Sequence, residues 1–332
     1  MENWSFLNLY TTNPAWNLAA EQYVFDCLSK ERSYVILWQN DRSVIIGKYQ
    51  NTLAEINQSY IEKHGIQVVR RLSGGGAVYH DLGNLNFTII TDAEVTENLD
   101  LHLFCQPVVE ALKTLGVPAE LNGRNDMTIE GKKFSGNAQY IRNRRIMHHG
   151  TIMFESDLSA LSNALRVDES KIQTKGIKSV RSRVTSIRPY LPMACDLETF
   201  RAKLLEQLRQ NMPGDDYTFD EQDQKQIQSI REERYDTWEW NYGKSPECDI
   251  QKRERFEGCG LVEAWISVRC GIITEIFFTG DFFSSEDPMI LAKAMVGLHA
   301  EREACRAFVK TVNVSRYFNG LKAEDFLKLL SD

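Results

Sequence analysis

The sequence lacks the features that mark membrane-spanning, secreted and nucleic-acid-binding proteins. It contains no stretch of about 18 apolar residues, the length that a membrane-spanning helix needs. Its first residues, Met1 to Trp4, are not a positive segment followed by an apolar one, so we expect no signal peptide and a cytoplasmic location. The formal net charge of −7 argues against a chain that binds nucleic acid as a whole, because such proteins are usually basic.

Cysteine is present, but not in the patterns that bind metals or form disulfide frameworks. The seven cysteines are odd in number, and none forms a Cys-x-x-Cys pair. We interpret them as reduced, mostly buried thiols of a cytosolic protein. The remaining composition, 42% hydrophobic and 26% charged, is ordinary for a globular enzyme. A length of 332 residues then favours two domains.

Glycine is concentrated in one stretch around which we expect the chain to be organised. Residues 70–84 read Arg-Arg-Leu-Ser-Gly-Gly-Gly-Ala-Val-Tyr-His-Asp-Leu-Gly-Asn. Three consecutive glycines let a ligand approach the backbone directly, and two arginines supply planar donors suited to phosphate or carboxylate. Residues 66–69 are predicted to form a short strand that holds the glycines at a sheet edge. The alternative is a flexible bend, because glycine is also an ordinary loop residue.

A second unusual stretch lies downstream. Residues 123–138 read Gly-Arg-Asn-Asp-Met-Thr-Ile-Glu-Gly-Lys-Lys-Phe-Ser-Gly-Asn-Ala, and residues 148–151 read His-His-Gly-Thr. Two common phosphate-binding motifs are excluded. Tyr79 stands where a dinucleotide fingerprint needs glycine, and Lys133 stands where a P-loop needs serine or threonine. A nucleotide, if one binds, is held by another architecture.

Periodicity and capping residues predict the secondary structure. Helices are expected over residues 14–28, 51–64, 101–115, 196–208, 287–298 and 323–330. Asn13 is a possible cap of the first helix, the second is expected to stop at Gly65, and Glu130-Gly131 is a hairpin signal. Strands are expected over residues 34–38, 43–47, 86–90, 126–129, 133–141, 146–154, 256–268 and 272–279. Strands that follow one another through hairpins favour a largely antiparallel or mixed sheet. The basic segment 167–190 is predicted to be a functional or disordered loop.

These motifs resemble lipoate–protein ligases. The two stretches, together with Lys-Ser-Val-Arg-Ser-Arg-Val at 178–184, follow that family's order, and the likeness extends to residues 16–19 and 238–243. The resemblance implies an α+β fold: a catalytic domain like that of class II aminoacyl-tRNA synthetases and biotin protein ligases, with a mainly antiparallel or mixed sheet and flanking helices. A small α+β C-terminal accessory domain would follow. We place the domains at 1–245 and 246–332, and the second contains no motif with assignable chemistry.

The resemblance also implies a reaction. The enzyme would be an ATP-dependent ligase that activates free lipoate, or octanoate, to lipoyl-AMP and releases pyrophosphate, with Mg²⁺ as the metal. It would then transfer the lipoyl group to a lysine of an acceptor, either the lipoyl domain of a 2-oxoacid dehydrogenase E2 subunit or the glycine cleavage H protein. We expect a monomer without a nucleic-acid or membrane partner.

Three alternatives stay open. An octanoyltransferase of the same fold would pass the acyl chain through a cysteine thioester, but no cysteine lies between Cys105 and Cys195, the span that contains the motifs. A non-catalytic lipoyl-binding partner is opposed only by the intact motifs. A biotin ligase is weaker, because its arginine–glycine signature differs from this one.

Lys133 is the predicted catalytic group. In the family, the matching lysine contacts the acyl carbonyl and the α-phosphate of the adenylate, where a fixed ammonium stabilises developing negative charge. The ordinary alternative is a solvated surface lysine. Lys132 is expected to face the other way, because alternate strand residues point to opposite sides. Asp126 could bind Mg²⁺, although a turn or cap role is an equal alternative.

The family likeness assigns the remaining site residues. Nucleotide and adenylate binding is expected from Arg71, Gly76, Ala77, Val78, Tyr79, Lys133, Lys178, Ser179, Val180 and Arg181. The lipoyl pocket is expected to comprise Arg71, Gly74, Gly75, His80, Lys133, Ser135, Gly136, Ala138, His149 and Gly150.

Three further interpretations concern neighbouring residues. Arg70 would support the same site or form a structural ion pair. The loop 175–184 would close over the adenylate and exclude water, whereas an RNA-binding role lacks interleaved aromatic residues. His148 and His149 are a poor zinc pair, because consecutive strand residues face opposite sides.

Overall fold

A large mixed sheet forms the centre of the catalytic region. The computed structural model describes residues 4–92, 101–122, 126–165, 184–192, 194–243, 250–269 and 271–331. The eight strands of the sheet have the order β11-β1-β2-β6-β10-β9-β8-β7. They are β1 Trp4–Asn8, β2 Ser33–Trp38, β6 Asn84–Asp92, β7 Glu120–Asn122, β8 Asp126–Ile129, β9 Lys132–Arg142, β10 Arg145–Met153 and β11 Gly214–Asp216. Strand β1 pairs in parallel with β2 and β11, and the other pairs are antiparallel, which confirms the predicted mixed sheet.

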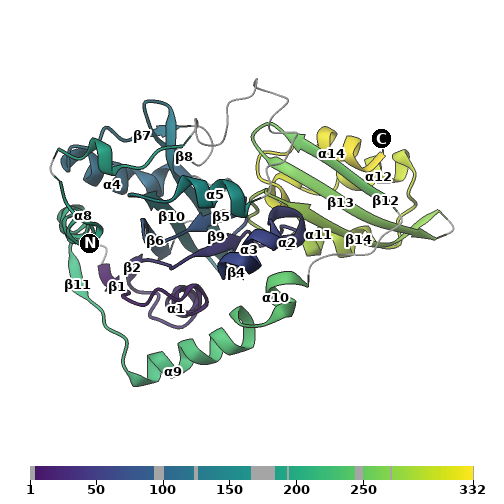
Figure 1. Ribbon diagram of the computed structural model, residues 1–332. Helices are drawn as coiled ribbons and strands as arrows, with labels where there is room; N and C mark the ends of the chain where they lie inside the picture. The colour runs from purple at the N-terminus through teal and green to yellow at the C-terminus, as the bar shows by residue number, and fades with distance from the viewer. Residues whose placement is uncertain are drawn as a thin grey trace.

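Helices cover both faces of this sheet (Figure 1). On one face, α4 Leu101–Thr114 and α8 Leu197–Asn211 pack against Val35 and Leu37 of β2. On the other face, α1 Pro14–Asp26 and α9 Glu221–Ile230 pack near Tyr34, Ile36 and Trp38. This alternation follows from the two-residue period of a strand, whose successive side chains point to opposite faces. As predicted, Asn13 caps α1: its side chain accepts from the amide of Trp16 at 2.9 Å.

The glycine-rich stretch belongs to a second, smaller sheet. Strands β4 Gln67–Arg70, β3 Ser43–Ile46 and β5 Val78–His80 have the order β4-β3-β5. Strand β3 is parallel to β4 and antiparallel to β5. The chain between β4 and β5 carries the three glycines, so they follow an edge strand as predicted.

The single helix predicted over residues 51–64 is wrong. Two helices, α2 Thr52–Glu55 and α3 Gln58–His64, occupy this range. Ile56 between them is extended and forms a bridge with Leu165, and the side chain of Asn57 then accepts from the Tyr60 amide to begin α3. The predicted end at Gly65 is confirmed, since this residue has a φ of +60°.

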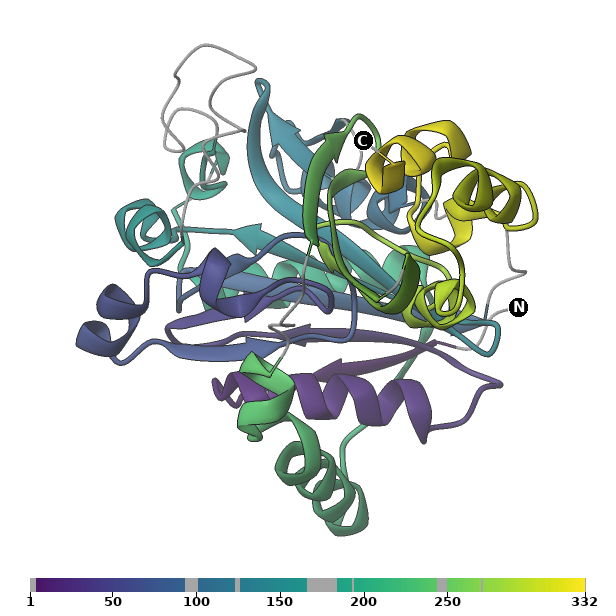
Figure 2. The ribbon, with the colours of Figure 1, turned by 90° about the vertical axis from the view of Figure 1, so that its right-hand side faces the viewer.

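The C-terminal domain has its own core. Its antiparallel sheet contains β12 Ile250–Phe256, β13 Gly260–Arg269 and β14 Ile272–Gly280. Its helices are α11 Pro288–Met295, α12 Arg302–Val309, α13 Val314–Tyr317 and α14 Ala323–Ser331. Figure 2 shows these helices gathered at one side of the domain's sheet. The single strand predicted over 256–268 is wrong at its start, because β12 ends at Phe256 and a turn with Gly258 at φ +79° precedes β13.

Short elements complete the fold. They are α5 Leu158–Ala164, the 3₁₀ turn η1 Arg188–Tyr190, the π-helical turn η2 Arg231–Tyr235 and α10 Trp238–Tyr242.

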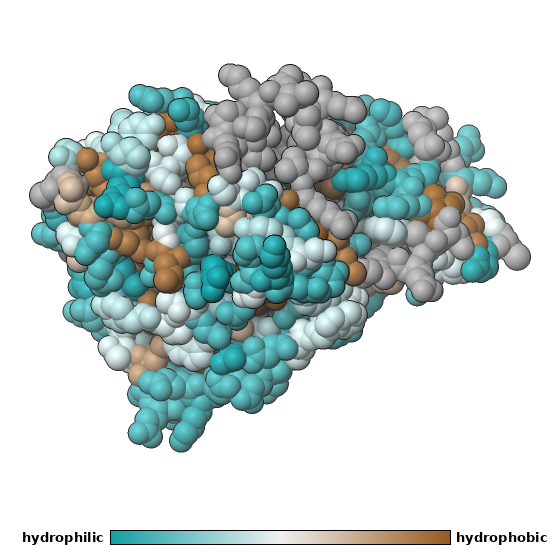
Figure 3. Space-filling model, in the orientation of Figure 1, coloured by the Kyte–Doolittle hydropathy of each residue, from teal (hydrophilic) through white to brown (hydrophobic). Residues whose placement is uncertain are grey.

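Figure 3 shows a largely hydrophilic face; α9, at its lower end, buries only Asp223 and Ile227. In the described parts of the chain, no helix is long and apolar enough to cross a membrane.

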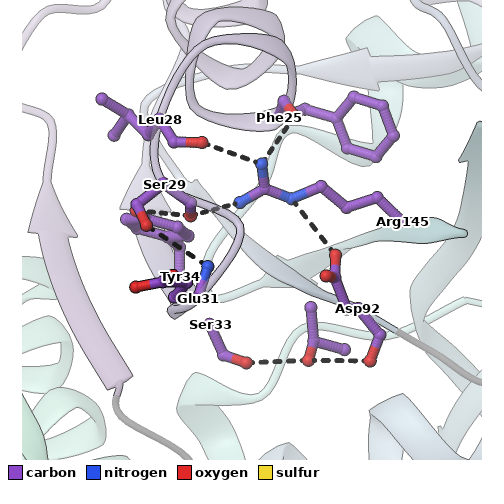
Figure 4. Close-up of polar contacts among 9 residues, drawn as sticks. Phe25, Leu28, Ser29, Glu31, Ser33, Tyr34, Asp92 and Arg145 are labelled. Carbon is purple, nitrogen blue, oxygen red and sulfur yellow. Dashed lines mark hydrogen bonds and ion pairs between the residues drawn. The ribbon is translucent and has the colours of Figure 1, made fainter. Parts of the chain in front are cut away.

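A buried arginine joins β10 to the end of α1 (Figure 4). The guanidinium of Arg145 donates to the carbonyl oxygens of Phe25, Leu28 and Ser29 at 3.0, 3.1 and 3.2 Å. These bonds satisfy carbonyls at the C-terminus of α1, where a cation is also favoured by the helix dipole. They fix α1 against the strand that carries His149.

Candidate active site

One cavity of about 240 Å³ brings most of the predicted site residues together. It is lined by Leu18, Trp38, Ile45, Arg71, Gly75, Gly76, Ala77, Val78, His80, Asn86, Lys133, Gly136, Asn137, Ala138, His149, Gly150, Thr151, Asp281 and Phe283. These residues come from α1, both sheets and the C-terminal domain. Their convergence supports the motif-based prediction of a single site.

Several predicted residues do not line this cavity. Tyr79 faces the other side of β5 and packs with Val44 and Ile46, whereas its neighbours in the strand line the wall. Ser135 is buried, and its hydroxyl accepts from Asn137 Nδ2 at 3.2 Å. Gly74 lies against the carbonyl of Phe282. Lys178, Ser179, Val180 and Arg181 lie outside the described residues.

Lys133 lies at the mouth of the cavity. Its Nζ is 2.7 Å from Asp126 Oδ1, and its side chain is 38% exposed. A Cβ at Gly136 would come within 3.2 Å of Nζ, so the glycine leaves room for the ammonium. Lys132 is exposed and does not line the cavity.

The two arginines of the glycine-rich stretch have different surroundings. Arg70 is fully buried and donates to the carbonyls of Gly47, Gln50 and Trp240 at 2.7–2.8 Å, among other oxygens. Its role is therefore structural, although its partners are carbonyls and not the acid of an ion pair. Arg71 lines the cavity, and its Nη2 donates to the carbonyls of Gly74 (2.5 Å) and Gly76 (2.9 Å). Burial lowers the pKa of each arginine to about 10, so both are charged at neutral pH.

His148 and His149 face opposite sides of β10, as strand geometry predicts. His148 is stacked between Phe87 and Phe104, and its Nε2 is 3.5 Å from Cys105 Sγ. Burial lowers the pKa of His148 to about 3, which keeps its imidazole neutral. This Cys–His pair lies on the α4 face of the sheet, whereas the cavity lies on the α1 face.

His149 and His80 both line the cavity. His149 Nδ1 is 2.9 Å from Glu21 Oε1, and its Nε2 is 2.6 Å from Ser73 Oγ. His80 Nδ1 is 3.1 Å from Asn40 Nδ2, and burial lowers the pKa of His80 to about 3. Neither ring belongs to a group of three metal-binding side chains, since no such group occurs among the described residues.

The C-terminal domain contributes a wall that the sequence motifs did not indicate. Phe283 is 1% exposed and packs on Ala138, and the amide of Gly75 donates to the carbonyl of Phe282 at 3.1 Å. Asp281 also lines the cavity and is held by the Leu261 amide at 2.6 Å. The pair of phenylalanines shortly after a predicted strand was the only local signal, and it does not specify which surface they cover.

Comparison with known families agrees with this geometry. The family model described as lipoyl protein ligase A/B catalytic domain matches residues 13–209, and that of the bacterial lipoate protein ligase C-terminus matches residues 245–330. The chain belongs to the lipoate–protein ligases. It is 42% identical to lipoate-protein ligase LplJ of Bacillus subtilis over 97% of this chain and 98% of that protein. It is 40% identical to lipoate–protein ligase 1 of Staphylococcus aureus over 96% and 97% of the two chains.

Solved structures show the same ligase fold. P. falciparum LipL1 aligns over 98% of this chain and 97% of its own with a TM-score of 0.79, at 22% identity. A crystal structure of lipoate-protein ligase A bound with ATP aligns over 73% and 99% of the two chains, with a TM-score of 0.63 and 28% identity. A bipartite ligase from Thermoplasma acidophilum, studied with its E2 lipoyl domain, aligns over 75% and 100% with a TM-score of 0.65 and 28% identity.

Proposed function

We propose that this ligase activates lipoate, or octanoate, with ATP and then transfers the acyl group to a lysine of an acceptor protein. Free carboxylate would attack the α-phosphate of ATP, giving the acyl-adenylate and pyrophosphate, and the acceptor amine would then displace AMP. The observation that carries this proposal is the single cavity lined by Lys133, the glycine-rich backbone and His149. A similar ligase has been crystallised with ATP, which supports the nucleotide.

The residues of the cavity suit these steps. The ammonium of Lys133 would stabilise negative charge on the acyl and phosphate oxygens. Arg71 would hold the glycine backbone in the shape that meets the adenylate, since it binds the carbonyls on both sides of Gly75. The apolar residues Leu18, Ile45 and Phe283 would enclose the acyl chain. The predicted Lys178–Arg181 contribution stays part of the proposal.

Magnesium fits the site only in a limited way. Asp126 offers one carboxylate, and one of its oxygens is paired with Lys133. Mg²⁺ in nucleotide sites is commonly bound by one or two carboxylates together with phosphate oxygens and water. We therefore propose Asp126 as a single protein ligand of a Mg²⁺ that neutralises phosphate charge.

We also propose the wider setting of the reaction. Acceptors would be the lipoyl domain of an E2 subunit or the glycine cleavage H protein; the related archaeal ligase was studied with an E2 lipoyl domain. The ligase would act as a cytoplasmic monomer. A domain boundary near residue 245 is supported by the two family matches, which cover 13–209 and 245–330.

The octanoyltransferase alternative would need a nucleophilic cysteine near a histidine, and Cys105 beside His148 is one candidate among the described residues. Cys105 belongs to α4, and the pair is buried between this helix and the sheet, on the face away from the cavity. A thioester there could not reach Lys133 without opening the core. The geometry therefore favours direct activation by ATP.

ATP–pyrophosphate exchange tests the proposal. The assay would use lipoate, octanoate and biotin in turn, followed by transfer to a panel of apo lipoyl domains and H protein detected by mass. We expect exchange with lipoate or octanoate and a mass increase on the acceptor lysine. Transfer from an acylated carrier protein without ATP would instead establish the transferase, and absence of both activities would leave only binding.

A further inference from the structure

A chain of buried hydrogen bonds runs beneath the cavity and joins three distant segments. Arg71 Nε lies 3.0 Å from Ser73 Oγ, which lies 2.6 Å from His149 Nε2. His149 Nδ1 lies 2.9 Å from Glu21 Oε1. The chain thus connects the glycine-rich stretch, β10 and α1. Ser73 lies within the glycine-rich stretch but was given no role there, and Glu21 belongs to no motif.

The donors and acceptors limit the direction of this chain. The Nε–H of Arg71 can only donate, so Ser73 Oγ accepts from it. The ionised carboxylate of Glu21 can only accept, so its contact with His149 Nδ1 requires a proton on Nδ1. In a neutral ring, Nε2 then accepts the hydroxyl proton of Ser73.

The far end of the chain is fixed in the same way. Trp38 Nε1 can only donate, and it lies 2.9 Å from Thr88 Oγ1. The Thr88 hydroxyl donates to Glu21 Oε1 at 2.6 Å, because an ionised carboxylate can only accept. Glu21 Oε1 thus accepts hydrogen bonds from both His149 and Thr88, and both series of donors end at its carboxylate.

Burial makes this arrangement costly to lose. Glu21 is 2% exposed, Ser73 is 1% exposed and His149 is 7% exposed. A buried donor or acceptor that loses its partner is destabilised by the full cost of removing it from water. Glu21 also supplies negative charge near the buried guanidinium of Arg71, whose pKa it raises against the effect of burial.

We propose that Glu21 and Ser73 are positioning residues of the ligase. Glu21 holds His149 in its Nδ1–H form, His149 holds Ser73, and Ser73 orients Arg71. Arg71 in turn holds the carbonyls of Gly74 and Gly76, so α1 sets the shape of the glycine backbone. The effect on catalysis rests on the proposed function, in which the glycine backbone meets the adenylate. The protonated nitrogen of His149 does not depend on that function.

The same three residues have the order of a nucleophilic Ser–His–acid triad. Two observations argue against that role. Ser73 does not line the cavity, and its oxygen already accepts from Arg71 Nε. A nucleophile must reach the acyl carbon, and this hydroxyl is directed into the core.

The first test is nitrogen NMR of the full-length protein, because imidazole ¹⁵N shifts distinguish the two neutral forms. The nitrogen signals of His149 are assigned by their absence from the spectrum of His149→Asn. We expect these signals to show the Nδ1–H form in the wild type, and this form to be lost in Glu21→Ala. An Nε2–H form or an imidazolium in the wild type at neutral pH overturns the proposal. This readout does not depend on ligase activity.

The second test separates positioning from general stability. Glu21→Gln keeps the shape of the side chain and removes its charge. The matched control is Tyr23→Phe, on the same helix, which deletes a buried hydroxyl 2.5 Å from Asp223 and away from the cavity. We expect Glu21→Gln to lower kcat for pyrophosphate exchange about tenfold, as loss of one charged hydrogen bond would, with KM for lipoate changed by less than about threefold.

The control defines the opposing outcome. Tyr23→Phe should lower the Tm and leave kcat unchanged. If both variants lower kcat equally at equal loss of Tm, the positioning role is wrong. Recovery of an acyl group on Ser73 by mass spectrometry would also overturn it in favour of a nucleophilic role. If the wild type itself shows no exchange, the proposed function fails, and the NMR result still decides the state of His149.

Discussion

Lys133 Nζ lies 2.7 Å from Asp126 Oδ1 across the hairpin of β8 and β9. The two side chains are 38% and 34% exposed, so the ion pair is screened by water and contributes little to stability. The ammonium can therefore exchange the carboxylate for an oxygen of a ligand at small cost. The hairpin therefore positions the lysine and leaves its ammonium available to a ligand.

Replacing Lys133 by alanine should slow catalysis with little effect on folding. Loss of one donor to developing charge typically reduces the rate by about 10²–10³-fold. Lys132→Ala is the matched control, because its exposed side chain does not line the cavity. Pyrophosphate exchange and thermal unfolding would be measured for both. Wild-type exchange in Lys133→Ala would refute the assignment.

Asp126→Asn should increase the Mg²⁺ concentration that half-maximal exchange requires. An amide is a weaker ligand than a carboxylate for a hard divalent cation, so we expect an increase of roughly tenfold. Glu130→Gln, at an exposed residue in the turn of the same hairpin, removes an equal charge and serves as the control. If the Mg²⁺ titration is unchanged in Asp126→Asn, Asp126 is not a magnesium ligand, and its contact with Lys133 is the role that is left.

Gly75→Ala should disturb the contact between the glycine-rich stretch and the C-terminal domain. Gly75 has a φ of +85°, and a Cβ there would lie 2.8 Å from the ring of Phe283. Gly131→Ala is the control, because Gly131 has a φ of +74° and open space around it. Both variants carry backbone strain of about 1 kcal/mol, and only the first adds a clash. Urea unfolding should show a larger loss for Gly75→Ala; equal losses would contradict the clash.

Phe283→Leu should weaken binding of the acid. Small changes in an apolar pocket alter discrimination by about 10-fold or more, and Phe283 is the wall that packs on Ala138. We expect KM for lipoate to rise about tenfold. Phe326→Leu, in the core of the C-terminal domain, should reduce Tm without this change in KM. A similar KM in both variants would remove Phe283 from the pocket wall.

Local signals in the sequence predicted most helices and strands, and most of the residues that line the cavity. The cap at Asn13, the turn at Glu130-Gly131 and the end at Gly65 are confirmed because each depends only on neighbouring residues. The break at Ile56 was missed because it depends on a bridge to Leu165, over a hundred residues away. A helical period of apolar residues does not reveal such a contact.

Three of the missed residues depend on contacts between segments that are distant in the sequence. Asp281 and Phe283 reach the cavity only because the C-terminal domain docks on Gly75, and no motif records that docking. Glu21 is followed by another polar residue, Gln22, in the predicted helix, and glutamate in helices is usually exposed, so the sequence gives no sign that it is buried. Only the fold shows that it is buried and opposite His149.

The stability of the ligase should fall in mild acid because of His148. Burial lowers the pKa of this imidazole to about 3, below the ordinary value of 6.5. Below pH 6.5, His148 is therefore protonated in the unfolded chain but stays neutral in the folded protein. The free energy of unfolding then falls as the pH falls towards 3. Between pH 7 and pH 5 the loss from one such group is about 2 kcal/mol.

His148→Gln should remove this contribution and flatten the pH dependence by about that amount, although the variant is less stable at pH 7. Urea unfolding at pH 7, 6 and 5 would measure it. His80 carries the same shift and remains in the variant, so some acid sensitivity should persist. His64→Gln, at an exposed histidine, is the control. If His148→Gln and the wild type lose equal stability between pH 7 and 5, the imidazole of His148 is protonated in the folded protein, and its stacking between Phe87 and Phe104 does not exclude the charge.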